Sequence, residues 1–243
     1  MSTKQIAPNV YEIPLGNVNA WLIDQDGLTL IDTGVPGSAD KILAAARELG
    51  KQPADIRCIL VTHGHPDHIG SLAALKRATG AKVYAHPLDA DIIRNGTGWR
   101  PLTVAPGFMV GLMFKLFIKQ PLPDVEGTAV EVEVNDGDEL PIAGGLKVIH
   151  APGHCKGQVA FLRSQNGGLL FAADACGNIP SLGWSLGYED LEEGKRSLMK
   201  LSQFDFQVAV FGHGEAITQN ASAQFRKKWG QARLVSSASS AVR

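Results

Sequence analysis

The sequence predicts an α/β fold, and three features of its 243 residues indicate this class. Short apolar runs that resemble strands alternate with helical segments through the first half of the chain. The second half is richer in hairpins. Candidate functional side chains follow several of the apolar runs directly, and in open α/β folds ligands gather at the carboxyl ends of strands.

Length and composition favour one large domain, or at most two. The net charge of −1 argues against a nucleic-acid or anionic-membrane partner. Three cysteines are an odd and sparse set, which favours a reducing compartment over a disulfide framework. Residues 1–8 do not have the pattern of a signal peptide. No apolar run approaches the roughly 20 residues that span a bilayer. We therefore expect a cytoplasmic protein.

The first half should begin with three strands, of which the second and third are joined by a hairpin turn at Asp24 to Gly27. A helix with one apolar face follows and stops at Gly50. In chain order we expect strands at 10–13, 20–23 and 28–31, a helix at 39–49, a strand at 58–61, a helix at about 70–78 and a strand at 82–85.

Residues 96–123 interrupt this alternation and form a predicted apolar insertion. Pro106 can start a helix that runs to about Lys119. Apolar side chains cover nearly its whole circumference, whereas a surface helix normally shows one apolar stripe. Either this helix is buried between layers, or it serves as a lid, a substrate wall or a dimer contact. Phe108 and Phe114 are the candidates for a substrate wall.

In the second half, Asp190 should begin a helix to about Leu201, with Glu193 three residues on as its capping partner. Residues 236–243 are rich in serine and alanine and are expected to form a flexible tail, so the domain should occupy residues 1–235. The remaining expected elements are strands at 130–134, 146–149, 159–162, 169–172 and 207–211 and a helix at 221–229.

The strongest chemical signal is the stretch from Thr62 to Gly70, in which His63, His65, Asp67 and His68 fall within six residues. Imidazole and carboxylate ligands suit zinc best, with iron and manganese as alternatives. The preceding apolar run predicts a buried strand, and glycine and proline then turn the chain. The first two histidines can face one position and the last two ligands a second. One loop could therefore serve two metals.

Three more candidate ligands, His154, Asp174 and His213, each follow an apolar strand. One metal needs about three or four protein ligands, so seven candidates predict two metals. If Asp174 bridges them, one metal takes His63, His65 and His154, and the other takes Asp67, His68 and His213. The alternative is that one or two of the seven support a ligand or belong to the core.

Two further residues are candidates for supporting roles. Asp32 is expected to orient a ligating histidine. Its alternative role is that of a turn carboxylate that binds only backbone N–H groups. Tyr188 lies fourteen residues past Asp174 and is a candidate to reach a substrate oxyanion.

The order His63-Gly-His65-Pro-Asp67-His68, His154, Asp174 and His213 resembles the metallo-β-lactamase superfamily. Asp32-Thr33-Gly34 and Gly212-His213-Gly214 match secondary motifs of that family. The resemblance covers residues 10–215. It implies an αβ/βα four-layer sandwich, with two mixed β-sheets flanked by helices. It also implies a binuclear hydrolase, usually with two zinc ions, whose metal ligands are the seven residues above.

The resemblance also bears on the substrate. β-Lactamases of the superfamily usually lack the bridging aspartate, so Asp174 favours the glyoxalase II, lactonase and esterase branches. His65 argues against the flavodiiron proteins, which have glutamate there. The nuclease branch usually carries an added domain and a more basic surface. Glyoxalase II usually has a larger helical region than the thirty residues that follow His213 here.

The implied mechanism is hydrolysis of a carbonyl ester or lactone by a metal-bridging hydroxide. Metal binding lowers the pKa of water from 15.7 to about 7. Asp67 and Asp174 are the catalytic candidates, and Asp67 or a metal-bound water would protonate the leaving group. Alternatives are a thioesterase similar to glyoxalase II and an iron-dependent dioxygenase of the same fold. We expect a small-molecule substrate, no nucleic-acid partner and, as one use of the apolar helix, a homodimer.

Overall fold

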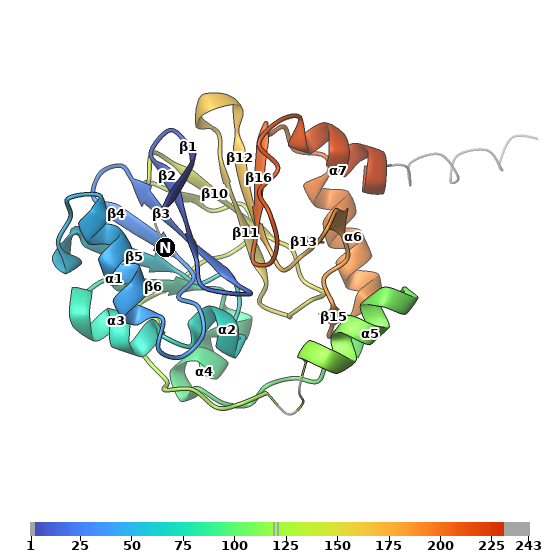
Figure 1. The fold of residues 1–243 in the computed structure, drawn as a ribbon, viewed down its shortest axis with the longest axis horizontal. Coiled ribbons are helices and arrows are strands. Elements are labelled where there is room, and N and C mark those ends of the chain that lie inside the picture. The colour runs from blue at the N-terminus through green and yellow to red at the C-terminus, as the bar shows by residue number, and fades with distance from the viewer. Residues whose placement is uncertain (1–2, 119, 121, 231–243) are drawn as a thin grey trace, which may run out of the picture.

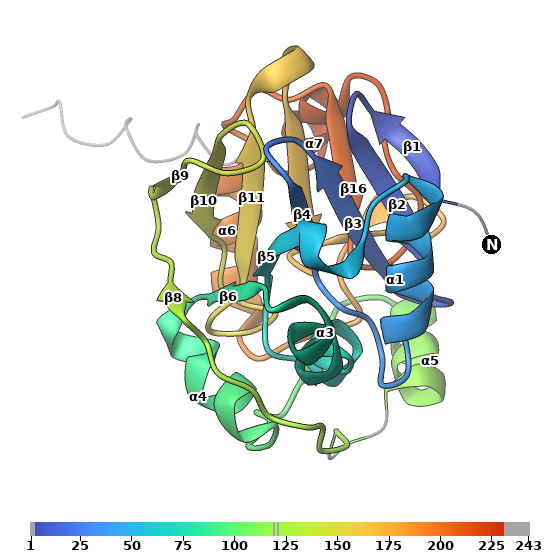
Figure 2. The same cartoon turned by 90° about the vertical axis from the view of Figure 1, so that its left-hand side faces the viewer.

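The computed structural model describes residues 3–118, 120 and 122–230, and it confirms the predicted four-layer sandwich (Figures 1 and 2). Two mixed β-sheets face each other in the middle, with helices on the outer face of each. The predicted flexible tail at 236–243 and the predicted domain end at 235 lie outside the described residues.

The first sheet has the strand order β1-β2-β3-β4-β5-β6-β8. Its first four strands are antiparallel, and the pairs from β4 to β8 are parallel. The strands are β1 (Lys4–Ala7), β2 (Val10–Pro14), β3 (Asn19–Asp24), β4 (Leu28–Ile31), β5 (Ile56–Leu60), β6 (Lys82–Ala85) and β8 (Val132–Glu133).

The second sheet has the order β16-β12-β11-β10-β9, and only its β12–β16 pair is parallel. Two short strand pairs, β13 with β14 and β7 with β15, lie outside both sheets. The strands are β7 (Thr103–Val104), β9 (Glu139–Leu140), β10 (Leu146–His150), β11 (Val159–Arg163), β12 (Leu169–Ala173), β13 (Gly177–Asn178), β14 (Leu182–Gly183), β15 (Gly187–Tyr188) and β16 (Val208–Phe211).

The structure contains all the predicted helices. The helix expected at about 70–78 runs from Leu72 to Thr79. A separate short helix inside the motif was not predicted, and it begins at Pro66, whose fixed φ suits a first helical position. The helices are α1 (Ala39–Glu48), α2 (Pro66–Ile69), α3 (Leu72–Thr79), α4 (Pro87–Asn95), α5 (Phe108–Phe117), α6 (Leu191–Leu201) and α7 (Ala221–Trp229), with 3-10 turns at Pro53–Asp55 and Gln165–Gly167.

Helix α6 begins as predicted, because the Asp190 side chain accepts a hydrogen bond from the Glu193 backbone N–H at 2.9 Å. Helix α4 was not predicted. It begins at Pro87, with the side chain of His86 accepting a hydrogen bond from the Leu88 backbone N–H. The prolines that open α2 and α4 therefore mark two helix starts beside the site.

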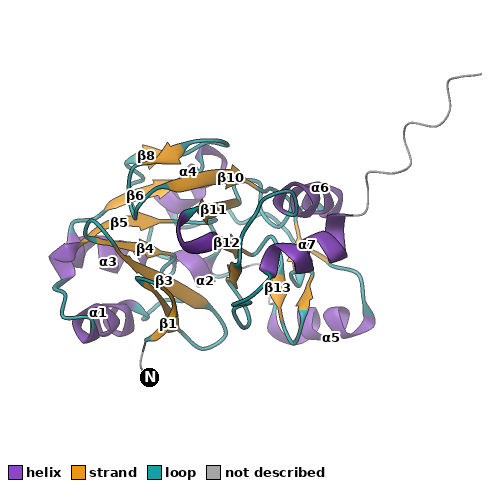
Figure 3. Cartoon of the chain, turned by 90° about the horizontal axis from the view of Figure 1, so that it is seen from above, coloured by secondary structure: helices purple, strands orange, loops and turns teal. Residues whose placement is uncertain are grey.

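Figure 3 shows the sheets and their outer helices from above. Three clusters of buried apolar side chains among the described residues fill the spaces between these layers. The cluster between the two sheets includes Trp21 from β3 and Phe171 from β12, whose rings meet edge to face at 6.0 Å. A second cluster packs α1 and α3 onto the first sheet, and a third packs α6 and α7 onto the second. Each sheet is thus covered on both faces, which explains the fully apolar runs in its central strands.

The insertion at 96–123 contains α5, and the prediction that this helix is buried between layers is wrong. No residue of α5 is buried, and Phe108 is 86% exposed. The helix starts after Gly107, which has a φ of 126°, and it packs beside β7 and β15 at the edge of the molecule (Figure 1). Among the described residues, no helix combines the length and apolar character needed to cross a bilayer.

Candidate metal centre

All seven predicted ligands lie just after the carboxyl ends of strands, where the two sheets meet. The motif with His63 follows β5, and Asp32 follows β4. His154 follows β10, Asp174 follows β12 and His213 follows β16. The structure brings these loops together in one buried cluster. Both halves of the chain contribute to it, so the site exists only in the folded protein.

His63, His65 and His154 form the first group, and all three side chains are buried. His65 Nδ1 lies 3.0 Å from His154 Nε2. Two imidazole nitrogens on one tetrahedral zinc would lie about 3.3 Å apart for the usual Zn–N bond of about 2.0 Å. His154 Nδ1 donates to the Gly187 carbonyl oxygen at 2.7 Å, which leaves its Nε2 with a lone pair facing the cluster.

Asp67, His68 and His213 form the second group. His213 Nε2 lies 3.3 Å and His68 Nε2 3.8 Å from Asp67 Oδ2. His213 Nδ1 donates to the Asn17 carbonyl oxygen at 2.5 Å, so Nε2 is the ring nitrogen that faces the cluster. These histidines therefore turn Nε2 toward the same place as the Asp67 carboxylate.

Asp174 lies between the two groups. Its Oδ2 is 3.2 Å from His213 Nε2 and 3.6 Å from His154 Nε2, and its Oδ1 is 3.5 Å from His68 Nε2. A Cβ at Gly212 would lie 1.9 Å from Asp174 Oδ1, so only glycine at that position leaves room for the carboxylate. This placement suits a ligand shared by two cations, and the ligand roles stay predictions.

Asp32 is fully buried and holds the motif loop at two points. Its carboxylate accepts hydrogen bonds from the Thr62 N–H at 2.9 Å and the Thr62 hydroxyl at 2.7 Å, and it lies 2.9 Å from His68 Nδ1. Because the Thr62 hydroxyl donates to Asp32, it accepts from His63 Nδ1 at 3.1 Å. Asp32 thus holds the ring of His68 directly and that of His63 through Thr62, with both Nε2 atoms turned toward the cluster. Its role in orienting metal ligands stays a prediction.

The donor atoms of this cluster are suited to bind metal cations. His63 Nε2, His65 Nε2, His68 Nε2 and Asp174 Oδ1 are buried and have no hydrogen-bond partner among the described residues. Buried polar atoms are almost always satisfied, because leaving one unpaired costs about 1–3 kcal/mol. Three of these atoms, on His63, His68 and Asp174, lie close together, while His65 faces the cluster with its Nδ1. Imidazole and carboxylate are donors that zinc prefers.

The electrostatics of the two groups differ. Burial lowers the pKa of His63 well below its usual value and that of His65 to about 3, so these imidazoles are neutral. Burial also opposes the charged form of His68, but Asp67, Asp174 and Asp32 outweigh it and raise the pKa of His68 to about 9. Asp174 and Asp67 likewise raise the pKa of His213. Without metal, the second group therefore balances its carboxylates with protons.

Tyr188 is placed differently from the prediction that it reaches a substrate. Its side chain is fully buried, and its hydroxyl donates to the Ala175 carbonyl oxygen at 2.8 Å and accepts from the Ser185 N–H at 3.1 Å. Its ring packs edge to face against His154 at 6.0 Å. Tyr188 is therefore a core residue that packs against His154, and its hydroxyl is not available to a substrate.

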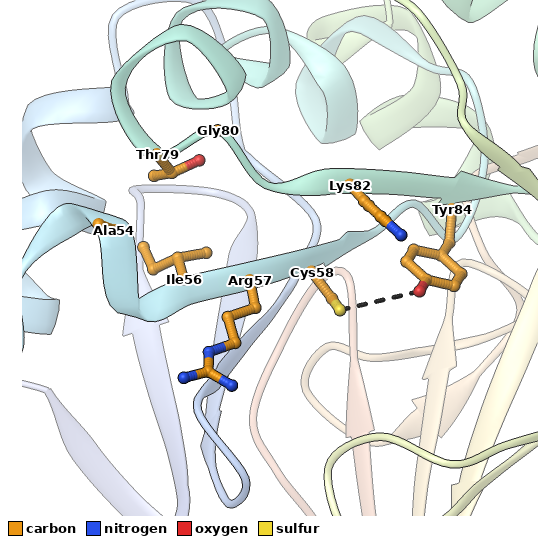
Figure 4. A pocket seen from close by; sticks show the side chains of 8 residues that line it. All are labelled: Ala54, Ile56, Arg57, Cys58, Thr79, Gly80, Lys82 and Tyr84. Atoms are coloured by element: carbon orange, nitrogen blue, oxygen red, sulfur yellow. Dashed lines mark hydrogen bonds between the residues drawn. The ribbon is translucent and has the colours of Figure 1, made fainter.

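Sequence reasoning missed the acidic and basic residues that surround the first group, namely Asp89, Arg100 and Glu189. The signal that could have found one of them is His86-Pro87, which marks the start of α4 and places Asp89 in its first turn. A separate open cleft of about 380 Å³ lies at the opposite, amino-terminal ends of β5 and β6 (Figure 4). It is lined by residues such as Arg57, Cys58 and Tyr84 and includes none of the predicted ligands.

A cluster of histidines and aspartates at the strand ends of a four-layer sandwich is the arrangement of a metal-dependent hydrolase. The family model described as the metallo-beta-lactamase superfamily matches residues 13–213. The chain belongs to this superfamily.

Relatives agree with this assignment. The probable metallo-hydrolase YflN of Bacillus subtilis (strain 168) is 26% identical over 89% of this chain and 83% of its own length. The uncharacterized protein YobT of the same organism is 33% identical over 65% of this chain, which spans 61% of YobT. The hydroxyacylglutathione hydrolase of Albidiferax ferrireducens is 40% identical over 77 residues, which are 30% of this chain and 28% of that enzyme.

The solved structures show the same fold. MEM-A1, a subclass B3 metallo-beta-lactamase isolated from a soil metagenome library, superposes with a TM-score of 0.73. The match covers 95% of this chain and 93% of MEM-A1, at 22% sequence identity. At this identity the likeness concerns the fold alone.

Proposed function

We propose that this protein is a binuclear zinc hydrolase that cleaves a carboxylic ester or lactone. One observation carries the proposal: seven candidate ligands converge from both halves of the chain, and the buried donor atoms that His63, His68 and Asp174 turn toward one another have no partner among the described residues. Two zinc ions would supply a water of lowered pKa and positive charge for the carbonyl oxygen. The protein side chains would bind the zinc ions and orient the water and the substrate carbonyl group.

Asp67 is the carboxylate of the cluster best placed to move a proton. Its side chain is 39% exposed, whereas that of Asp174 is 5% exposed. Burial opposes ionisation of Asp67, but His68 and His213 hold its pKa well below the usual value, so it is ionised at rest. Asp67 would accept a proton from the attacking water and return it to the leaving alkoxide. Asp174 would stay ionised and hold the two histidine groups at a fixed distance from each other.

The proposal is tested by metal content and a substrate panel. We expect two zinc ions per chain and faster turnover of lactones or carboxylic esters than of β-lactams, phosphoesters or thioesters. Removal of metal by a chelator should abolish turnover, and added zinc should restore it. One iron per chain together with oxygen consumption would instead indicate a dioxygenase and would overturn the proposal.

Thioester hydrolysis is the second candidate, and the similarity to a hydroxyacylglutathione hydrolase favours it. That similarity covers 30% of this chain. A rate on glutathione thioesters above the rate on oxygen esters would select this alternative within the same panel.

We further propose that α5 forms an apolar wall for the acyl part of the substrate. The Phe114 ring lies over the backbone of Gly187, because a Cβ there would be 2.8 Å from Phe114 Cε2. The Gly187 carbonyl oxygen in turn holds His154. Phe114 is therefore linked to the first histidine group through one residue, whereas Phe108 is exposed at the start of the helix.

Phe114→Ala should weaken binding of long-chain esters more than that of short-chain esters. Burial of one phenylalanine-sized side chain contributes about 1.5–3 kcal/mol, which is roughly ten- to a hundredfold in affinity. KM and kcat for esters of increasing chain length measure the effect. Phe108→Ala is the matched variant on the same helix and should change KM less. An equal change at all chain lengths in a folded Phe114→Ala protein would contradict the substrate wall.

Two other expectations stay proposals. The three cysteines are free and buried, which fits a reducing compartment, and we propose a cytoplasmic location. The exposed apolar side chains of α5 would also suit a homodimer contact. In that case size-exclusion chromatography should show a dimer that Phe117→Ser converts to a monomer.

A further inference from the structure

A buried carboxylate outside the seven ligands connects the two loops that carry the first histidine group. Asp89 Oδ2 accepts a hydrogen bond from the N–H of Gly64, the residue between His63 and His65, at 2.9 Å. The same oxygen accepts from the thiol of Cys155, which follows His154, at 3.2 Å. Asp89 Oδ1 accepts from the Gly157 N–H at 3.1 Å. One side chain of α4 therefore touches a loop from each half of the chain.

Arg100 holds Asp89 in this position. Its Nη2 pairs with Asp89 Oδ1, and its Nε donates to both oxygens of Glu189 at 2.8 Å. Glu189 also accepts from the Lys156 N–H at 3.1 Å, and its own N–H donates to the His154 carbonyl oxygen at 3.2 Å. The side chains of Asp89 and Glu189 are 1% and 7% exposed, so both carboxylates are nearly closed to water, while that of Arg100 is 24% exposed. The guanidinium fork suits such paired contacts, which a lysine could not make at once.

The packing around Asp89 is equally specific. A Cβ at Gly157 would lie 2.4 Å from Asp89 Cγ, so glycine is required there for the carboxylate to reach the loop. Asp89 receives four donors, from Gly64, Cys155, Gly157 and Arg100, and a carboxylate can accept all of them.

We propose that Asp89, held by Arg100, is a positioning residue that fixes the spacing of His63, His65 and His154 and thereby sets the metal affinity of this group. This inference rests on the proposed metal centre. The physical reason is that the three histidines come from two loops, and the strands that precede these loops, β5 and β10, lie in different sheets. Residues that hold ligands in place typically change metal affinity by roughly 10–100-fold when they are lost.

His65, Cys155 and Glu189 have ligand atoms within 4.8 Å of one another, but their surroundings do not suit a further metal site. The Cys155 thiol donates its proton to Asp89, and burial raises its pKa well above the usual value. Glu189 is bound by Arg100, whose charge lies 3.3 Å from the Cys155 sulfur. A cation there would face a guanidinium group, so the network serves to hold the loops.

The test is Asp89→Asn, which keeps the size of the side chain but replaces one acceptor oxygen with an NH₂ donor. At least one of its four donors would then face another donor. Competition with a chromogenic chelator measures zinc affinity at both sites. We expect the affinity for one of the two zinc ions to fall by roughly 10–100-fold and the other to change little. Asp91→Asn is the matched control, since Asp91 lies on the same helix with its side chain 88% exposed, and it should leave both affinities unchanged.

Arg100→Lys provides a second variant that keeps the charge. It should lower the same zinc affinity in the same direction, whereas Arg94→Lys, at an exposed ion pair, should not. Thermal unfolding with and without zinc separates positioning from general stability. If the variant loses positioning, the difference between the melting temperatures with and without zinc becomes smaller. If the residue has a purely structural role, both melting temperatures fall equally and the zinc affinity does not change.

Two zinc ions bound with wild-type affinity in both Asp89→Asn and Arg100→Lys would overturn the positioning role but leave the proposed function standing. A wild-type protein that binds no metal would overturn both.

Discussion

Replacing Asp174 with alanine is expected to leave at most one tightly bound metal per chain and to lower turnover by at least about 100-fold, more than the loss of a supporting residue. Among the described residues, Asp174 is the one carboxylate that lies within 3.6 Å of histidines from both groups. Without it, the two groups share no ligand, and the positive charge of two cations would be balanced by Asp67 alone within the seven-residue set. Elemental analysis and the rate on the best ester or lactone measure the two effects.

Asp205→Ala is a suitable control for this variant, because Asp205 is an exposed aspartate whose partner is Arg226. It should keep both metals and full turnover. An Asp174→Ala protein with two bound metals and unchanged activity would rule out the shared carboxylate.

Metal binding to the second group should strengthen steeply with pH, whereas binding to the first group should not. Three neighbouring carboxylates raise the pKa of His68 to about 9, so it carries a proton at neutral pH that a cation must displace. Affinity should rise about tenfold per pH unit for each proton displaced and level off above about pH 9 for His68. The first group has neutral histidines, with the pKa of His65 at about 3, and needs no such exchange at pH 6 to 9.

Calorimetric titration in buffers of different ionisation enthalpy counts the protons released. We expect no release on filling the first site and release of about one proton or more on filling the second at pH 7. Binding of both metals with equal and pH-independent affinity would show that His68 and His213 are neutral in the metal-free protein.

The same charges affect the stability of the metal-free protein. Because the pKa of His68 is raised from 6.5 in the unfolded chain to about 9 in the fold, the stabilisation is complete below about pH 6.5 and is lost as the pH rises through 9. The free energy of unfolding without metal should therefore fall over this interval. Asp32→Asn should reduce the fall, since it removes one of the charges that hold the proton.

The sequence by itself determined the fold class and the seven residues of the cluster. The reason is that both signals are local. Apolar runs mark central strands that are covered on both faces, and polar side chains placed directly after such strands must appear at one rim of the sheets. His154 and His213 were found in this way, although each is far in sequence from the motif at 62–70. The helix start at Asp190 was equally visible, because capping depends on neighbours in the chain.

Only the tertiary structure decided the placement of residues whose partners are distant. Because the sequence of α5 is apolar on every side, it does not indicate which face of the helix packs against the rest of the fold. In the structure, Phe108 is exposed. Tyr188 has a hydroxyl that could serve a substrate, but the fold satisfies it with Ala175 and Ser185.

The contacts of Asp89 show the same limit most clearly. No spacing in the chain relates α4 to the loops of Gly64 and Gly157, which lie 25 residues before and 68 residues after Asp89. The packing of the layers brings these loops beside α4. Because a buried carboxylate must be hydrogen-bonded, Asp89 accepts from the N–H groups of these loops. The seven candidate ligands could thus be predicted from local sequence, while the residues that contact their loops follow from how the two halves pack.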